Sequence, residues 1–283
     1  QAEGDVPPGH PVDTFRVENE AIRRTLDDLS KAMADLAALS ADAEPGLPLR
    51  RARQAANDLM DVDKHYQRKE NLLFSVLERH GITGPSKVMW GKDDEARGAL
   101  KTLQVTLRQS YAKAVHAAAA LKPAATAAVE AIGSMIDKEE TILLPMSLQT
   151  LTEDEWGQIW QQSPEYGWCL VEPRAGYAPP ESLQAQETVE LPHGRSVAFP
   201  AGSLTFEQLV GVFSTLPVDL TFVDAEDRVR FFSESSGRIF ARSRAIIGRK
   251  VQHCHPPDSV DVVERILDDF RSGRQSVAEF WIN

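Results

Sequence analysis

The chain has few cysteines, few aromatic residues and no excess of positive charge. Its 283 residues include two cysteines, Cys169 and Cys254, and aromatic residues make up 7%. Two cysteines so far apart exclude the disulfide framework of small secreted proteins, and we expect a reducing cytoplasm. With 42 acidic and 31 basic residues, the formal net charge is −11. This balance argues against nucleic acid or a membrane surface as a partner.

Long apolar runs are missing as well. No stretch approaches the roughly 18 consecutive apolar residues of a membrane span, so we expect none. Hydrophobic residues still make up 42% of the chain, which is enough for two packed cores. A length of 283 residues predicts about two domains.

Four amphipathic stretches occupy the first half of the chain. Residues 12–40, 49–80, 85–122 and 124–148 place apolar side chains at helical spacing. Each stretch also has ionisable side chains on or beside its apolar stripe. The members of this polar set are Glu18, His65, Lys69, Glu70, Asp93 and Glu139. Buried ionisable groups are costly unless they are paired or bind a metal, so the pattern predicts an all-α four-helix bundle with a polar centre.

Two interpretations of this centre compete. Inward carboxylates and an imidazole on facing helices are typical of a metal site, and such oxygen-rich ligation suits iron or manganese. The alternative is a buried ion pair, most simply Lys69 with Glu139, with the other carboxylates reaching water. The set contains four carboxylates and one lysine, so a single pair leaves negative charge uncompensated. That surplus favours a bound cation.

Two segments resemble the halves of a known metal-binding pattern. His65-Tyr66-Gln67-Arg68-Lys69-Glu70-Asn71-Leu72-Leu73-Phe74 and Lys138-Glu139-Glu140-Thr141-Ile142-Leu143-Leu144-Pro145 resemble the hemerythrin-like (HHE cation-binding) domain. The segments 9–12, 18–20, 88–91 and 163–169 resemble a bacterial subfamily that joins this domain to a C-terminal PAS domain. The resemblance implies a mononuclear or dinuclear non-haem iron site. Its candidate ligands are His10, Glu18, His65, Glu70, Asp93, Glu139 and Glu140.

The chain departs from the family pattern at four ligand positions. Lys69 stands where the pattern has a bridging Glu, and Met135 stands four residues before Glu139 in place of His. Asn19 and Asp93 also occupy positions where relatives carry His. The full set of five histidines and two carboxylates is therefore absent, and reversible oxygen carriage is not expected. A mononuclear iron, a weakly held pair and a vestigial site remain open, and an ammonium could itself replace one cation.

His10 has a second interpretation besides metal ligation. It precedes Pro11, a residue suited to the first turn of a helix, at one end of the bundle. It could equally be a surface-loop histidine.

The second half of the chain has mixed α+β patterning. We expect a bundle over 1–170, a linker rich in Pro, Ala, Glu and Gln over 171–190, and a second domain over 191–283. Its predicted elements are strands at 197–199, 219–224, 228–232 and 276–282, and helices at 205–215, 236–240 and 259–271. This order is similar to the PAS fold. The resemblance implies about two further strands after Asn283, so we expect an incomplete PAS sheet.

The second domain also contains a histidine–cysteine cluster, His253-Cys254-His255, followed by two prolines. Two imidazoles beside a thiol at a helix entrance could bind a metal or, less readily, haem iron, or could form a redox-sensitive thiolate. Alternatively, the prolines determine the turn while Cys254 packs inside as a small apolar side chain. Neighbouring residues of an extended run point to opposite faces, which disfavours joint chelation by all three.

Together these features predict a cytoplasmic sensor with iron in a helical bundle coupled to a PAS module. The expected signal is oxygen, nitric oxide or redox state, and PAS domains commonly pair, so a homodimer is expected. One alternative is a non-haem iron oxidase or peroxide-handling enzyme, with iron held by His65, Glu70 and Glu139. Another is a metal-free interaction protein.

Overall fold

The computed structural model describes residues 6–180, 196–233, 244–255 and 257–279. The chain divides into two compact units, residues 1–179 and 180–283. Within the described residues, no helix is long and apolar enough to cross a bilayer.

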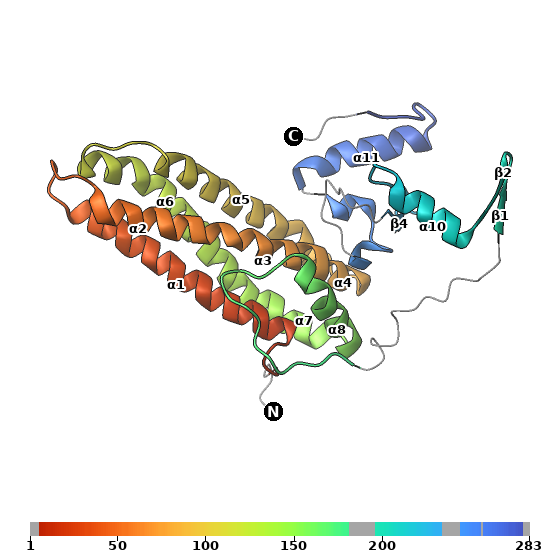
Figure 1. Cartoon of the computed structure of the whole chain (residues 1–283), viewed down its shortest axis with the longest axis horizontal. Coiled ribbons are helices and arrows are strands. Elements are labelled where there is room, and N and C mark those ends of the chain that lie inside the picture. Colours follow the sequence, from red (N-terminus) through yellow and green to blue (C-terminus); the bar gives the residue numbers. More distant parts are fainter. Residues whose placement is uncertain (1–5, 181–195, 234–243, 256, 280–283) are drawn as a thin grey trace. The chain divides into compact units, whose positions relative to one another are not determined.

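The first unit is a bundle of four long helical rods (Figure 1). The rods are α1 (Pro11–Ala38); α2 (Gly46–Asp58) continuing through η1 (Leu59–Asp61), α3 (Val62–Arg68), η2 (Lys69–Leu73) and α4 (Phe74–Arg79); α5 (Gly84–Leu107); and α6 (Ala114–Lys138) continuing through η3 (Glu139–Leu143) and α7 (Leu144–Thr150). Helix α1 packs against α2 and α6, and α5 packs against the same two. This ring buries the apolar stripes in the bundle core, as the 3.6-residue periodicity predicts.

The second and fourth rods each contain one π-helical turn. These turns, η2 and η3, begin at Lys69 and Glu139. A π turn adds a residue to one helical turn. It therefore changes which residues after it face the core, compared with a regular helix. Lys69 and Glu70 at the start of η2 are buried, and so is Arg68 just before it. Single π turns are frequent at functional sites.

The predicted break between the third and fourth helices, at residue 123, is wrong. Helix α5 ends at Leu107, and α6 runs from Ala114 straight through Pro123, which is exposed. The end of α5 is determined by a distant side chain: Arg53 Nε donates to the carbonyl oxygen of Leu107 over 2.9 Å. Such a long-range cap is invisible in local sequence.

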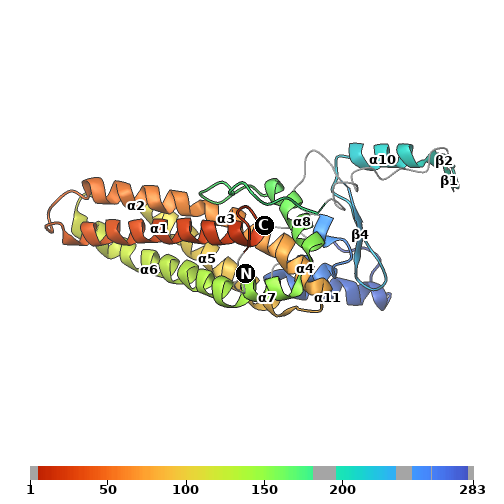
Figure 2. The ribbon, with the colours of Figure 1, turned by 90° about the horizontal axis from the view of Figure 1, so that it is seen from below.

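Beyond the fourth rod, α8 (Glu153–Gln162) folds back on the bundle. Thr152 is its N-cap, and Thr152 and Glu155 form a capping box. The chain then continues through η4 (Ser163–Glu165) and a loop that passes over the start of α1 (Figure 2). We call residues 163–179 the closing segment. Its residues 171–179, expected in the linker, belong to the bundle unit.

In its described residues, the second unit contains two separate antiparallel hairpins. Its elements are β1 (Ser196–Phe199), β2 (Gly202–Thr205), α10 (Phe206–Thr215), β3 (Thr221–Val223), β4 (Val229–Phe232), η6 (Arg244–Ile246), η7 (Val251–Cys254) and α11 (Pro257–Arg271). Strand β1 pairs with β2 and β3 pairs with β4, with an irregularity between Phe222 and Val223. Val229 and Phe232 of β4 form a small apolar core with Ile246, and Cys254 packs against it.

The predicted elements of this unit are largely found, with a few differences. Thr205 caps α10 through a capping box with Gln208. Strand β2 was not predicted. The expected helix at 236–240 lies outside the described residues, and so does the end of the predicted strand 276–282, whose residues 276–279 are not in a strand.

Candidate functional site

His65 is at the centre of the buried polar network. It projects from α3, and its ring is completely buried. Its Nδ1 lies 2.8 Å from a Glu18 carboxylate oxygen, and its Nε2 lies 2.9 Å from Glu139. Burial alone would lower the pKa of His65, but the carboxylates of Glu139 and Glu18 raise it overall. The arrangement therefore favours an imidazolium that donates from both nitrogens.

Glu18 connects this network to the closing segment. One carboxylate oxygen accepts from His65 and from the Arg68 guanidinium, and the other accepts from the backbone N–H of Cys169 over 2.8 Å. The Arg68 guanidinium lies over the rings of Phe15 and Trp168, at 5.2 and 4.8 Å from their centroids. Helix α1, helix α3 and the closing segment thus meet at one carboxylate.

Lys69 occupies the other side of the centre. Its Nζ donates to Asp93 over 2.7 Å and to Glu139, and it lies 4.3 Å from the centroid of the Tyr66 ring. Burial alone would lower the pKa of Lys69, but Asp93 and Glu139 raise it overall. Burial would raise the pKa of Glu139, yet Lys69 and His65 hold it below its usual range. The arrangement therefore favours a charged Lys69 and a charged Glu139.

A second group of charges extends from Asp93 to the surface. Burial, with the nearby carboxylates of Glu70 and Glu139, raises the pKa of Asp93 well above its usual range despite Lys69. Asp93 and Glu70 lie close enough to affect each other's pKa, and the raised pKa of Asp93 favours its protonated form. Glu70 in turn accepts two hydrogen bonds from Arg97, at 2.8 and 2.9 Å.

Two predicted ligands lie away from the network. His10 is the N-cap of α1, where its Nδ1 accepts from the Val12 N–H over 3.2 Å, and its ring contacts Trp156 and Tyr177. Glu140 pairs with Arg23 at the half-exposed rim, over 2.7 Å. The remaining predicted ligands, Glu18, His65, Glu70, Asp93 and Glu139, are brought together in the core.

In the histidine–cysteine cluster of the second unit, His253 and Cys254 lie in the 3₁₀ turn η7 and His255 follows it. Cys254 packs against the small apolar core, and its thiol lies 3.6 Å from the Lys250 carbonyl oxygen. His253, Cys254 and His255 are each partly buried. This placement favours the packing role of Cys254 over a shared ligand role.

Sequence reasoning missed the two arginines of the network, Arg68 and Arg97. Regular helical spacing does not place Arg68 on the apolar stripe, and it is buried because Phe15 and Trp168 cover its guanidinium, which pairs with Glu18. Arg97 follows Asp93 by four residues, one helical turn, and this spacing could have identified it.

The donor set does not suit a metal ion. Among the residues that the structure describes, no group of three His, Cys, Asp or Glu side chains could hold one. The His65 nitrogens and both Glu139 oxygens are already engaged within the network, and the Lys69 ammonium lies between Asp93 and Glu139. An imidazolium has no free lone pair to offer, and an ammonium repels a cation.

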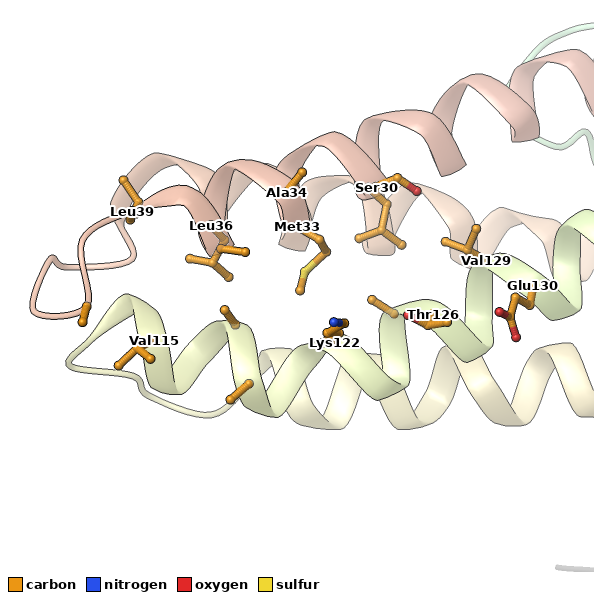
Figure 3. A pocket seen from close by; sticks show the side chains of 16 residues that line it. Ser30, Met33, Ala34, Leu36, Leu39, Val115, Lys122, Thr126, Val129 and Glu130 are labelled. Carbon is orange, nitrogen blue, oxygen red and sulfur yellow. The ribbon is translucent and has the colours of Figure 1, made fainter.

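The apolar groove between α1 and α6 is separate from this network (Figure 3). It has a volume of about 770 Å³ and is lined mainly by alanine and other apolar side chains, with Lys122 and Glu130 among the few polar ones. None of its lining residues belongs to the polar network, so it is not a route to the centre.

The polar network lies within a recognised domain. Residues 10–147 match the family model of the hemerythrin HHE cation binding domain. Residues 209–283 match that of a PAS domain. A comparison with curated proteins gave no match.

Proposed function

Because the chain joins a hemerythrin HHE cation-binding domain to a PAS domain, we propose that it is a signalling protein whose bundle centre communicates with the PAS domain through the closing segment. The pairing of these two domains fits a sensor or signalling protein. The observation that carries the coupling proposal is the hydrogen bond from the Cys169 N–H to Glu18.

Glu18 is the residue through which the centre can act on the closing segment. Its carboxylate binds His65 and Arg68 from the network and Cys169 from the segment. A rearrangement of His65 or Arg68 would move or release this carboxylate. The segment would then lose an anchor only eleven residues before Pro180, where the second unit begins.

A second anchor lies further along the closing segment. The Arg174 guanidinium pairs with Asp13, whose carboxylate also accepts from the Gly9 N–H over 2.7 Å. The segment is therefore attached at both its middle and its end to α1. Anchors of charge-assisted hydrogen bonds are stronger than neutral ones, and they can be released by a change in a single partner.

The coupling is tested by hydrogen exchange on the full chain with Glu18→Gln, which keeps the side-chain shape but removes its charge. We expect faster exchange in residues 166–179 and altered exchange in the PAS peptides of 209–279. Glu20→Gln, an exposed change on the same helix, is the matched control and should leave both unchanged. Altered hydrogen exchange confined to the bundle unit would contradict the proposed coupling to the PAS domain.

The narrower prediction is that bundle iron responds to oxygen, nitric oxide or redox state. The arrangement of donors does not support it, nor the iron-enzyme alternative, because Glu70 pairs with Arg97 while His65 pairs with Glu18 and Glu139. Absorption spectra of the purified chain, taken without oxygen and then with oxygen or nitric oxide, test both. Ligand-dependent iron bands would restore the iron-sensor interpretation.

The expected homodimer is also a proposal, with the PAS unit as the contact. Several large apolar side chains of this unit are exposed, including Phe222 on β3 at 61%. Phe222→Asp should shift the sedimentation of the full chain from dimer to monomer. Val105→Asp, on the bundle and 60% exposed, is the matched control. A wild-type monomer, or a dimer that survives Phe222→Asp, would contradict this contact.

A further inference from the structure

The position of Lys69 is the most unusual feature of the polar centre. Its ammonium is completely buried where α3, α5 and η3 meet, and it bonds to the carboxyl groups of Asp93 and Glu139. A buried ammonium is costly unless it is paired, and here two oxygens and the face of Tyr66 satisfy it. The side chain is held at the junction of the helices, as a bound cation would be.

The charges around Lys69 also balance without a metal. Four cationic groups, His65, Arg68, Lys69 and Arg97, lie among the carboxyl groups of Glu18, Glu70, Asp93 and Glu139. If all four carboxyl groups are ionised, these eight groups are neutral together, and Arg97 also pairs with Asp63 and Asp94 at the partly exposed edge of the bundle. The raised pKa of Asp93 can only remove a negative charge from the buried set. A divalent cation would therefore add uncompensated positive charge to a closed interior.

Two further positions are unsuited to holding iron. Met135, four residues before Glu139, is buried and offers only a soft thioether. Asn19 is buried, and neither polar atom of its amide has a hydrogen-bond partner in the described part of the chain. A neutral amide is a weaker ligand than the carboxylate or imidazole that such sites use.

We propose that the Lys69 ammonium is the permanent cation of this HHE domain, so that the bundle folds and remains closed without a bound metal. This inference concerns the centre itself and does not depend on the relay to the PAS domain. The domain then retains the fold of a cation-binding family while an amino group of its own chain occupies the cation's role.

The first test is metal content and thermal unfolding of the full wild-type chain. We expect well below one metal ion per chain after purification, and the same unfolding temperature with EDTA, with added Mn²⁺ and with neither. About one or two retained ions per chain, together with a lower unfolding temperature after chelation, would overturn the proposal. This measurement is decisive even if the variants below do not fold.

The second test removes the ammonium. Lys69→Met should lower the unfolding temperature by roughly 10 °C, because Asp93 and one oxygen of Glu139 lose the ammonium and only His65 still neutralises Glu139. Added Mn²⁺ should restore part of this loss, since a cation can now enter. Lys64→Met in α3, on the same helical rod, loses a half-exposed pair with Asp61 and is the control that should show neither effect. An unchanged unfolding temperature for Lys69→Met would contradict the proposal.

Discussion

At the scale of single residues, the bundle centre depends on mutual neutralisation. Glu139 accepts from both His65 and Lys69, so it compensates two buried cations at once. A buried ion pair adds little stability relative to an apolar pair of the same shape, but removal of one partner leaves an uncompensated charge. The centre therefore tolerates the loss of a single member poorly.

Glu139→Ala should reduce the free energy of unfolding by about 3–5 kcal/mol, because Lys69 and His65 then lose their shared carboxylate. Glu140→Ala is a close control, since the neighbouring carboxylate pairs with half-exposed Arg23 and should cost about 0–1 kcal/mol. Urea unfolding of both variants measures the difference. Equal losses would show that Glu139 is not a paired core carboxylate.

His10 gives the bundle a pH dependence of defined sign. Burial, with a smaller effect of Arg16, lowers the pKa of His10 from 6.5 to about 4. The unfolded chain therefore binds the proton more readily than the folded chain between these values, and the stability from neutral His10 is present above pH 6.5 and lost as pH falls toward 4. His10→Asn keeps an N-cap without titrating, so its stability should fall less steeply over this window. Parallel pH profiles of unfolding free energy would exclude His10 as the source.

The sequence predicted which residues belong to the network better than it predicted the net charge of the network. Glu18, His65, Lys69, Glu70, Asp93 and Glu139 are all buried, as the apolar stripes indicate. The predicted surplus of negative charge is not present among these groups, because Arg68, Arg97 and a charged His65 were not counted. Helical periodicity identifies residues on the apolar stripe of a helix, whereas Arg68 lies off that stripe and is buried by Phe15 of α1 and Trp168 of the closing segment.

At the scale of elements, the same limit explains the helix boundaries. Four amphipathic patterns identify four rods, but they do not locate the boundary between α5 and α6. Arg53 contacts the last residue of α5, and the N–H of Ala114, the first residue of α6, donates to the Ala43 carbonyl oxygen over 2.7 Å. Both contacts join segments far apart in sequence. The alanine-rich stretch has high helix propensity on both sides of Pro123, so propensity alone does not locate the helix boundary. Tertiary contacts determine it.

The start of α1 and the closing segment pack through glycine backbones. Gly9 has a φ of +81°, and a Cβ there would clash with the Arg174 carbonyl oxygen. Gly81 has a nearly equal φ of +79°, with nothing near its Cβ position. Gly81→Ala should therefore cost about 1 kcal/mol from backbone strain alone, whereas Gly9→Ala should cost more and displace the segment. Unfolding free energies measure the loss of stability, and limited proteolysis within 163–179 measures the displacement of the segment. If both variants lose the same free energy of unfolding and are cleaved equally, Gly9 does not hold the segment.

At the scale of the whole molecule, the two-domain organisation follows from the change in periodicity along the chain. The position where the bundle unit ends cannot be read from that periodicity. Residues 171–179 are rich in proline and small residues, which is typical of linkers, yet Arg174 and Tyr177 contact Asp13 and His10. Composition describes how a segment behaves alone and carries no information about a partner at the other end of the unit.

Truncation tests whether the closing segment is part of the bundle. A chain ending at residue 179 should unfold with the same bundle transition as the full chain, because residues 1–179 form one compact unit. A chain ending at 162 lacks Trp168, Cys169 and Arg174, so the Glu18 carboxylate, the Arg68 guanidinium and the Asp13 carboxylate lose partners and face water. Because buried charged groups that lose partners are costly, its bundle should be several kcal/mol less stable, at about 1.5–3 kcal/mol for each charged hydrogen bond lost. Calorimetry of the two fragments beside the full chain provides the comparison. If the two fragments unfold at the same temperature, the segment only lies on the surface and cannot hold the centre closed.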